Sequence, residues 1–269
     1  MARLFFNLSI LFVLVLPLVS LAAEPPEGMA YIPEGEFIMG ASGKEGLLGI
    51  EVGVDSIPAH KVYLKSFYID RYETTNAEYK KFMKKTGARI PPLWGPWYAP
   101  DYPPIGDKEP VSDITWFEAD AYCKWAGKRL PTEEEWEKAA RGTDGRRFPW
   151  GDDWKEDIAN TEVYSFKKQK PDDKRFTHTV AEVGAFKGDV SPYGVYDMGG
   201  NVMEWTSSWY NPYPGSVLKR ETFGEKARIM RGGSWMSGPI PFSFTFNRHY
   251  GMPIEDHPYF GIRCAKDAQ

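Results

Sequence analysis

The chain has 269 residues, with 33 Lys and Arg against 37 Asp and Glu, so its formal charge is −4 at pH 7. This mildly acidic balance argues against nucleic acid or an anionic membrane as the main partner. Aromatic residues make up 15% of the chain, which also contains 26 Gly and 22 Pro. That composition is typical of a loop-rich globular protein whose irregular segments are held by large rings.

An apolar run opens the chain. Residues 1–22 contain a basic Arg3, then many Leu, Val and Phe residues, with small residues at Ser20 and Ala22. This is the pattern of a secretory signal peptide. The uninterrupted apolar stretch is shorter than the roughly 20 residues that span a bilayer, which disfavours a membrane anchor. We expect cleavage after Ala22, a single domain at 23–269, and a secreted or periplasmic protein that does not contact the membrane after cleavage.

The first part of the mature chain is predicted to form strands and then a helix. Residues Gly28–Gly40 alternate apolar and polar side chains, which indicates a strand or a hairpin with one buried face. The apolar residues within 62–69 predict one further strand. Thr75 or Asn76 is a suitable N-cap for a helix that ends at Gly87.

The middle of the chain alternates breakers and helix signals. Residues 89–110 are rich in Pro and contain two Trp, which predicts a surface lobe near any binding cleft. A second helix is predicted from about 115 to 126. In a third, Thr132 and Glu135 form a capping box, and Gly142 ends the helix.

The stretch Gly194–Trp209 (GVYDMGGNVMEWTSSW) fits neither a helix period nor a strand period, and predicts a rigid loop. Asp197 and Glu204 are seven residues apart, with Gly and Asn turn formers between them. A tight turn can therefore bring both carboxylates, together with backbone carbonyls, around one hard ion, for which calcium is the natural choice. The alternative is a core loop whose acids accept hydrogen bonds from backbone amides.

Cys123 and Cys264 are the only cysteines of the chain. In an exported protein a pair of cysteines is more often bridged than free, and a single pair has one connectivity. The alternative is two buried, reduced thiols.

Seven motifs appear along the chain in a fixed order. They are GMAYIPEGEFIMG at Gly28–Gly40, FYIDRYETTNAEY at Phe67–Tyr79, AGKRLPTEEEWEKAARG at Ala126–Gly142, FPWGDD at Phe148–Asp153, GNVMEW within Gly194–Trp209, RGGSW at Arg231–Trp235 and FGIRC at Phe260–Cys264. In these motifs the sequence resembles the formylglycine-generating enzyme, or sulfatase-modifying factor, family. The resemblance covers nearly the whole mature chain.

The resemblance implies the fold and two structural features. The expected fold is α+β, of the C-type-lectin-like kind that formylglycine-generating enzymes have, rich in irregular structure. A structural disulfide is implied between Cys123 and Cys264. The expected calcium ligands are Asp197, Gly200, Val202 and Glu204, and a second calcium site is expected at Asn160 with Asp172 or Asp173.

The resemblance also points to a difference at the catalytic centre. Family members that make formylglycine carry the pattern GGSWxCxxxxC, whose two thiolates bind copper and engage the substrate cysteine. Here the matching positions are Ser237 and Phe242. A serine hydroxyl is a poor ligand for soft monovalent copper and phenylalanine has no ligand atom, so copper is not expected.

A different metal is an alternative. Non-heme iron sites use two histidines and a carboxylate, or three histidines. The chain has His60, His178, His249 and His257, and none of them falls in an HxH or HxxxH pattern. His249 and His257 border the groove that the resemblance implies, so they are the best candidates for iron ligands or for acid–base catalysis. Surface hydrogen bonding is the alternative role for both histidines.

Three functions follow as expectations. The first is a non-oxidase family member that binds an exported peptide or protein during its maturation or assembly, in a groove formed by Trp235, Ser237, Asn247, Arg248 and Arg263. The second is a metal-dependent oxidase or oxygenase in the same groove, with Ser237, His249 and His257 as candidate catalytic residues. The third is a lectin-like carbohydrate binder that uses exposed rings near 94–102 and 209–213.

Overall fold

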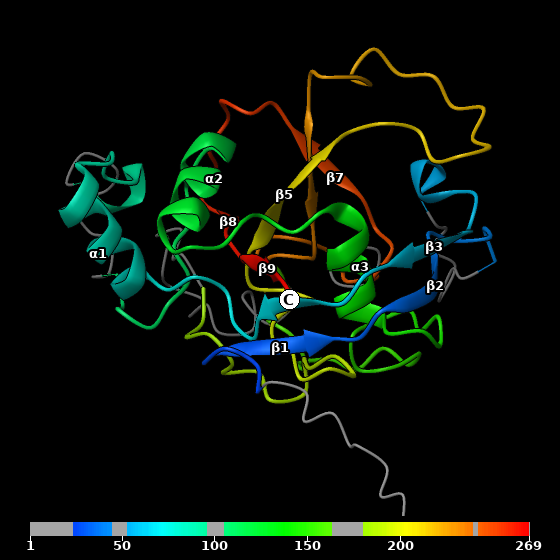
Figure 1. Cartoon of the computed structure of the whole chain (residues 1–269), viewed down its shortest axis with the longest axis horizontal. Helices are drawn as coiled ribbons and strands as arrows, with labels where there is room; N and C mark the ends of the chain where they lie inside the picture. Colours follow the sequence, from blue (N-terminus) through cyan, green and yellow to red (C-terminus); the bar gives the residue numbers. More distant parts are fainter. Residues whose placement is uncertain (1–23, 45–52, 96–104, 163–179, 239–241, 269) are drawn as a thin grey trace, which may run out of the picture.

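The structure is a computed structural model that describes residues 24–44, 53–95, 105–162, 180–238 and 242–268. The predicted signal peptide lies outside these residues. Helices and strands are joined by long irregular segments, which confirms the α+β expectation (Figure 1). Within the described ranges none of the helices has the length and apolar character needed to cross a bilayer.

The helical elements are α1 (Asn76–Thr86), α2 (Trp116–Trp125), α3 (Glu133–Arg141) and the short 3-10 turns η1 (Val54–Ser56) and η2 (Pro92–Trp94). The strands are β1 (Met29–Ile32), β2 (Gly35–Met39), β3 (His60–Leu64), β4 (Phe67–Asp70), β5 (Met203–Trp209), β6 (Arg228–Arg231), β7 (His249–Gly251), β8 (Phe260–Gly261) and β9 (Ala265–Asp267).

All three α-helices begin at a threonine that closes a capping box. Thr75, Thr115 and Thr132 each accept a hydrogen bond from the backbone N–H three residues further on, where a Glu side chain accepts one in return. α1 ends at Gly87, whose φ of 74° is the left-handed conformation that glycine adopts without strain. The three predicted helices are confirmed, because their start and stop signals are local.

The strands form three sheets, ordered β1-β4-β9, β2-β3 and β7-β6-β5-β8. β1 pairs with β4 and β2 pairs with β3, so a hairpin within residues 28–40 is wrong. The single strand predicted within 62–69 is also wrong. β3 and β4 belong to different sheets, and the chain passes from one sheet to the other at Lys65 and Ser66.

The predicted loop at 194–209 is a loop only in its first half. Its second half is β5, which pairs antiparallel with β6 and parallel with β8. The first four residues of β5 are all buried, so the strand is covered on both faces and shows no alternation of apolar and polar residues. This explains why a search for strand periodicity missed it.

α3 packs against strands of two different sheets, β2 and β3 of one and β5 and β6 of another. One apolar cluster joins α1 and α2 to β5 and β8, and another joins β1 and β4 to α3. α1 and the β2–β3 hairpin lie toward opposite ends of the long axis (Figure 1). In the predicted surface lobe at 89–110, Leu93 is buried and donates its backbone N–H to Asp113, so that part belongs to the core.

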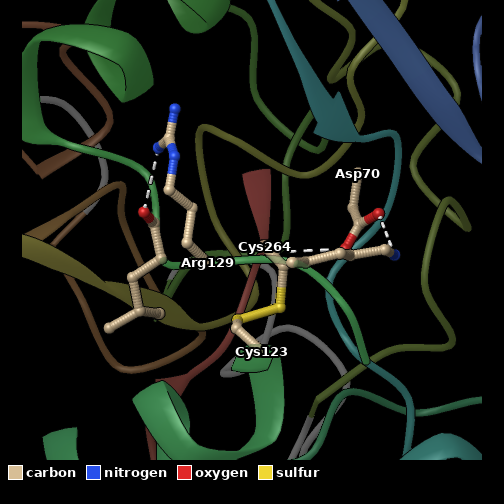
Figure 2. The surroundings of a disulfide bond; sticks show 6 residues. Asp70, Cys123, Arg129 and Cys264 are labelled. Atoms are coloured by element: carbon tan, nitrogen blue, oxygen red, sulfur yellow. Dashed lines mark hydrogen bonds and ion pairs between the residues drawn. A yellow bond between two sulfur atoms is a disulfide. The ribbon is translucent and has the colours of Figure 1, made fainter. Parts of the chain in front are cut away.

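Cys123 in α2 and Cys264 before β9 form a disulfide with a Cα–Cα distance of 5.7 Å, which confirms the predicted bridge. Figure 2 shows it beside Asp70, which exchanges backbone and side-chain hydrogen bonds with Cys264. The bridge closes a loop of 141 residues and fastens the C-terminal strand to the helical end of the core.

We expect denatured, unreduced protein to contain no reactive thiol in a thiol titration, and two after reduction. Replacing both Cys123 and Cys264 by Ser should lower the free energy of unfolding by about 2–5 kcal/mol, as is usual for loss of a native disulfide. Two reactive thiols before reduction would contradict the bridge.

Candidate functional site

The first turn of α3 is held by buried ion pairs. Glu133 accepts hydrogen bonds from Arg248 at 2.7 and 2.9 Å and from Arg231 at 3.0 Å. Glu137, one turn further along α3, binds Arg231 at 2.6 Å and Arg141 at 2.8 Å. These side chains are almost fully buried. These ion pairs hold the C-terminal end of β6 and the segment before β7 against α3. They thereby set the position of the loop that connects β6 to β7.

A second buried pair lies on β5. Both carboxylate oxygens of Glu204 accept hydrogen bonds from Arg263, and the indole N–H of Trp136 donates to Glu204. Arg263 has no exposed surface and also donates to the backbone carbonyls of Asp70 and Tyr196. The Glu204–Arg263 salt bridge, with the Trp136 indole, therefore ties β5, α3 and the C-terminal segment together.

The turn before β5 is lined by buried acids and amides. Glu73 accepts from the side chain of Asn201 at 2.6 Å and from the backbone N–H of Val202 at 3.0 Å. Asn160 donates to Asn201 at 2.9 Å, and the backbone of Asn201 is left-handed, with φ of 68°, a conformation that Asn tolerates. A Cβ on Gly200 would collide with the carbonyl of Asn160, so glycine is required there.

Burial dominates the titration of these acids. It raises the pKa of Glu73 well above the ordinary value, and the neighbouring carboxylates of Asp197 and Glu204 raise it further. Burial also raises the pKa of Asp197 to about 6, although hydrogen bonding from the backbone of Gly184 and the charge of Arg263 both favour its ionised form.

These contacts bear on the calcium prediction. Calcium takes 6–8 oxygen ligands, whereas Glu204 is already the counter-ion of Arg263 and Asp197 accepts from a backbone amide. Among the described residues no group of three or more His, Cys, Asp or Glu is placed to hold a metal. In this arrangement Glu204 does not offer calcium a free carboxylate. Asp172 and Asp173 lie outside the described residues, and both calcium sites stay predictions.

Glu204→Gln should lower the free energy of unfolding by roughly 3–5 kcal/mol, because it leaves the Arg263 guanidinium buried without a counter-charge. Denaturant unfolding measures this loss, and an exposed Glu24→Gln variant serves as the control.

Thermal melting of the wild type and of Glu204→Gln, each with and without a calcium chelator, tests the metal prediction. If Glu204 is a calcium ligand, chelation lowers the melting temperature of the wild type and leaves that of the Gln variant unchanged. Equal melting curves for the wild type with and without chelator would contradict the prediction that the fold binds calcium.

The loop after β6 brings together several of the predicted site residues. The hydroxyls of Ser234 and Ser237 lie 2.8 Å apart, both buried. The backbone of Trp235 is fixed by a hydrogen bond to Asn201, and its indole N–H lies 3.4 Å from the carbonyl of Pro258. This loop is thus anchored to the turn before β5.

Phe242 and His249 close one side of the same region. Their rings stack with centroids 5.2 Å apart and planes within 5°. Asn247 lies 2.8 Å from Nε2 of His249, so the amide donates and that ring nitrogen accepts. A methyl group on Gly238 would contact the ring of Phe242 at 3.5 Å and the carboxylate of Glu162 at 3.9 Å. Ser237, Phe242, His249 and Glu162 therefore border one region.

Three other predicted site residues lie elsewhere. Arg248 and Arg263 are buried in the ion pairs above and present no guanidinium to a ligand beside Trp235. His257 is exposed, stacks on Tyr259 with centroids 5.4 Å apart, and contributes its backbone carbonyl to Asp113 and Phe260. His178 lies outside the described residues.

Among the rings proposed for carbohydrate binding, Trp94 is half-buried, and Trp97, Tyr98 and Tyr102 lie outside the described residues. Tyr210 and Tyr213 are buried, so their exposure was wrongly predicted, and Trp209 is half-buried. Sequence reasoning missed Glu73 and Glu162. Glu73 lies within the FYIDRYETTNAEY motif, three residues after the end of β4, but its sequence context gave no sign of its role; Glu162 lies in none of the seven motifs.

His249 should make the protein sensitive to mild acid. Burial lowers its pKa from 6.5 to about 4, and the guanidinium of Arg231 adds to this. Because the folded-state pKa is depressed, this neutral ring contributes stability above pH 6.5 that is lost as the pH falls toward 4. The contribution is at most about 3 kcal/mol, from ~1.4 kcal/mol per pKa unit.

The measurement is the free energy of unfolding at pH 7 and pH 4 for the wild type and His249→Gln, which keeps an acceptor for Asn247. Carboxyl groups titrate equally in both proteins, so the difference isolates His249. We expect the wild type to lose more stability than the variant, and equal losses would contradict a neutral, partly buried ring at His249.

With this geometry described, three comparisons define the class of protein. The sulfatase-modifying factor enzyme 1-like domain matches residues 17–268. The chain is 31% identical over 301 residues to the inactive C-alpha-formylglycine-generating enzyme 2 of Mus musculus, covering 96% of this chain and 92% of the mouse protein. It is 33% identical over 274 residues to hercynine oxygenase of Mycolicibacterium smegmatis, covering 88% of this chain but 60% of that protein.

The fold agrees with these sequence relationships. The structure of PvdO from Pseudomonas aeruginosa superimposes with a TM-score of 0.67 at 28% identity, over 89% of this chain and 94% of PvdO. The chain belongs to the sulfatase-modifying factor, or formylglycine-generating enzyme-like, family. That family includes proteins named as inactive and proteins named as oxygenases, so membership does not by itself define a reaction.

Proposed function

We propose that this chain is an exported, non-oxidase member of its family that binds a peptide or protein partner during the partner's maturation or assembly. The observation that carries the proposal is the Cys123–Cys264 disulfide. Because the chain has only two cysteines, both are held in this bridge. No thiolate remains for copper or for a mixed disulfide with a substrate cysteine.

The region around Ser237 supports the same proposal. The serine hydroxyl is hydrogen-bonded to Ser234, and Phe242 packs its ring against His249. An apolar ring and a buried hydroxyl pair stand where the family resemblance places two redox thiols. The similarity to a mouse protein named as an inactive formylglycine-generating enzyme over 96% of this chain agrees with loss of that chemistry.

The surface around the Ser237 loop favours a binding function. Met236, on the loop between Trp235 and Ser237, exposes its apolar side chain, and the partly exposed Asn247 lies nearby along the chain before β7. Apolar surface with a few fixed hydrogen-bonding groups suits an extended peptide. Export is supported by the predicted signal peptide and by the disulfide, since such bridges persist in oxidising compartments.

An oxygenase is the second candidate, and the similarity to hercynine oxygenase favours it. Iron would need ligands in this region, where His249 is the one predicted histidine that lies close to Ser237 and Phe242. Its Nε2 accepts from Asn247, so Nδ1 carries the proton of the neutral ring, and iron at Nε2 would have to displace the Asn247 amide. With Glu162 nearby, this is one histidine and one carboxylate, short of the two histidines and carboxylate of a facial triad.

The deciding experiment follows the mass of a CxPxR peptide under oxygen, with the protein loaded in turn with copper and with ferrous iron. A formylglycine-generating enzyme serves as the positive control. We expect no change in peptide mass. Conversion of the cysteine to an aldehyde would contradict the non-oxidase assignment, and oxygen uptake dependent on iron would move the protein to the oxygenase class.

The binding half of the proposal is tested by selecting displayed peptides on the wild-type protein. Enriched peptides should bind Met236→Glu at least about tenfold more weakly, because the new charge is desolvated at the contact. They should bind Val217→Glu, a change at an exposed site, as well as they bind the wild type. Failure to enrich any sequence, or equal binding to both variants, would count against a peptide groove at this loop.

A further inference from the structure

A cavity of about 650 Å³ lies away from the Ser237 region, between the β2–β3 hairpin, the first turn of α3 and the segment that follows β5. None of Trp235, Ser237, Phe242 or His249 lines it. Its volume is within the roughly 300–1,000 Å³ of small-molecule sites. Most of its lining is polar side chains interspersed with rings, which distinguishes it from a packing defect in an apolar core.

The cavity is lined by two cationic side chains, Lys61 and Arg248, and two anionic ones, Glu133 and Glu134. Arg248 and Glu133 are paired with each other in the floor, and Lys61 lies 3.3 Å from Glu36 at the rim. Glu134 is then left as a lining carboxylate without a cationic partner among the described residues, so an anionic ligand is disfavoured and a ligand that donates hydrogen bonds to this carboxylate is favoured.

The polar groups that face the cavity include both donors and acceptors. Within the described parts of the chain, the Glu134 carboxylate has no hydrogen-bond or ion-pair partner. Nδ1 of His60 lies 3.1 Å from the carbonyl of Pro58, so Nδ1 carries the proton and Nε2 is an acceptor. Ser208 accepts from the backbone of Glu133, which leaves its O–H to donate.

Aromatic surface completes the cavity. Arg228 covers one face of the Trp209 ring at 3.3 Å from the centroid, and Trp209 is half-buried at the cavity wall. Tyr213 is fixed below it by an edge contact with His60, centroids 4.8 Å apart. A rigid indole beside hydrogen-bonding groups offers apolar contact to one side of a ligand and polar contact to its edge.

We propose that this cavity binds a neutral polyhydroxylated ligand, a pyranose unit of a sugar. The ring C–H groups would pack on Trp209, and the hydroxyls would donate to Glu134 and His60 and accept from Ser208. A pyranose matches these observations, because it is not anionic, has both donor and acceptor at each hydroxyl, and has an apolar face. The site is independent of the peptide-binding proposal, and either can fail without the other.

The test uses saturation-transfer NMR and calorimetric titration of the mature protein with three probes: methyl β-D-glucopyranoside, methyl α-D-mannopyranoside and methyl β-D-N-acetylglucosaminide. Putrescine serves as a cationic probe of the unpartnered Glu134. We expect at least one glycoside to bind and putrescine not to bind. Glu134→Ala should weaken glycoside binding about tenfold or more, since it removes charge-assisted hydrogen bonds.

Glu221→Ala, an exposed change outside the cavity, is the matched control and should bind like the wild type. Trp209→Phe provides a second variant that keeps a ring against Arg228, and it should weaken binding without lowering the melting temperature as far as Trp209→Ala. Circular dichroism confirms folding of each variant. The proposal is overturned if no glycoside binds, if putrescine binds in their place, or if Glu134→Ala and Glu221→Ala bind equally.

Discussion

Charged side chains that are paired away from water are the constraint on which the rest of the structure depends. Glu133 and Glu137 of α3 hold Arg231 and Arg248, and Glu204 of β5 holds Arg263. Removing one partner from such a pair is costly, whereas replacing the whole pair by apolar residues is often neutral. The pairs therefore act mainly by linking segments: each requires its two segments to stay together, and a single change in either is strongly disfavoured.

This linkage explains how the scaffold can persist while its chemistry changes. The Ser237 loop is fixed through its backbone, by the hydrogen bond from Trp235 to Asn201 and by the ion pairs at its ends. Neither Ser237 nor Phe242 contributes a charge to that network. Side chains at these two places can differ without breaking a buried pair, in keeping with the general separation of site from scaffold.

The parts of the fold that could be predicted are those with local signals. The capping boxes at Thr75, Thr115 and Thr132 mark the helix starts, and each box involves only four consecutive residues. β5 could not be recognised, because burial on both faces of its first half removes the alternation that marks a strand, and its partner residues lie 19–27 residues away in β6 and 57 residues away in β8. The pairing of β1 with β4 likewise cannot be predicted from the local sequence of either strand.

In the candidate site, too, some features could be predicted from the sequence and others could not. Family motifs located Ser237, Phe242 and His249 in one region, since order along a shared fold carries over between relatives. They did not reveal that Arg248 and Arg263 are buried counter-ions, because their carboxylate partners are 115 and 59 residues away. An arginine in a groove and an arginine in a core pair look alike in sequence, and only the position of the partner carboxylate separates them.

The acids around the turn before β5 show three ways in which a buried carboxyl is accommodated. A buried carboxyl can keep its proton, pair with a cationic side chain or bind a metal ion. Glu204 has Arg263, and Glu73 is shifted strongly toward its protonated form. Asp197, with a pKa of about 6, lies between these cases. A cation beside Asp197 would favour its ionised form, so its protonation near neutral pH and the presence of an ion at this turn are two readings of the same balance.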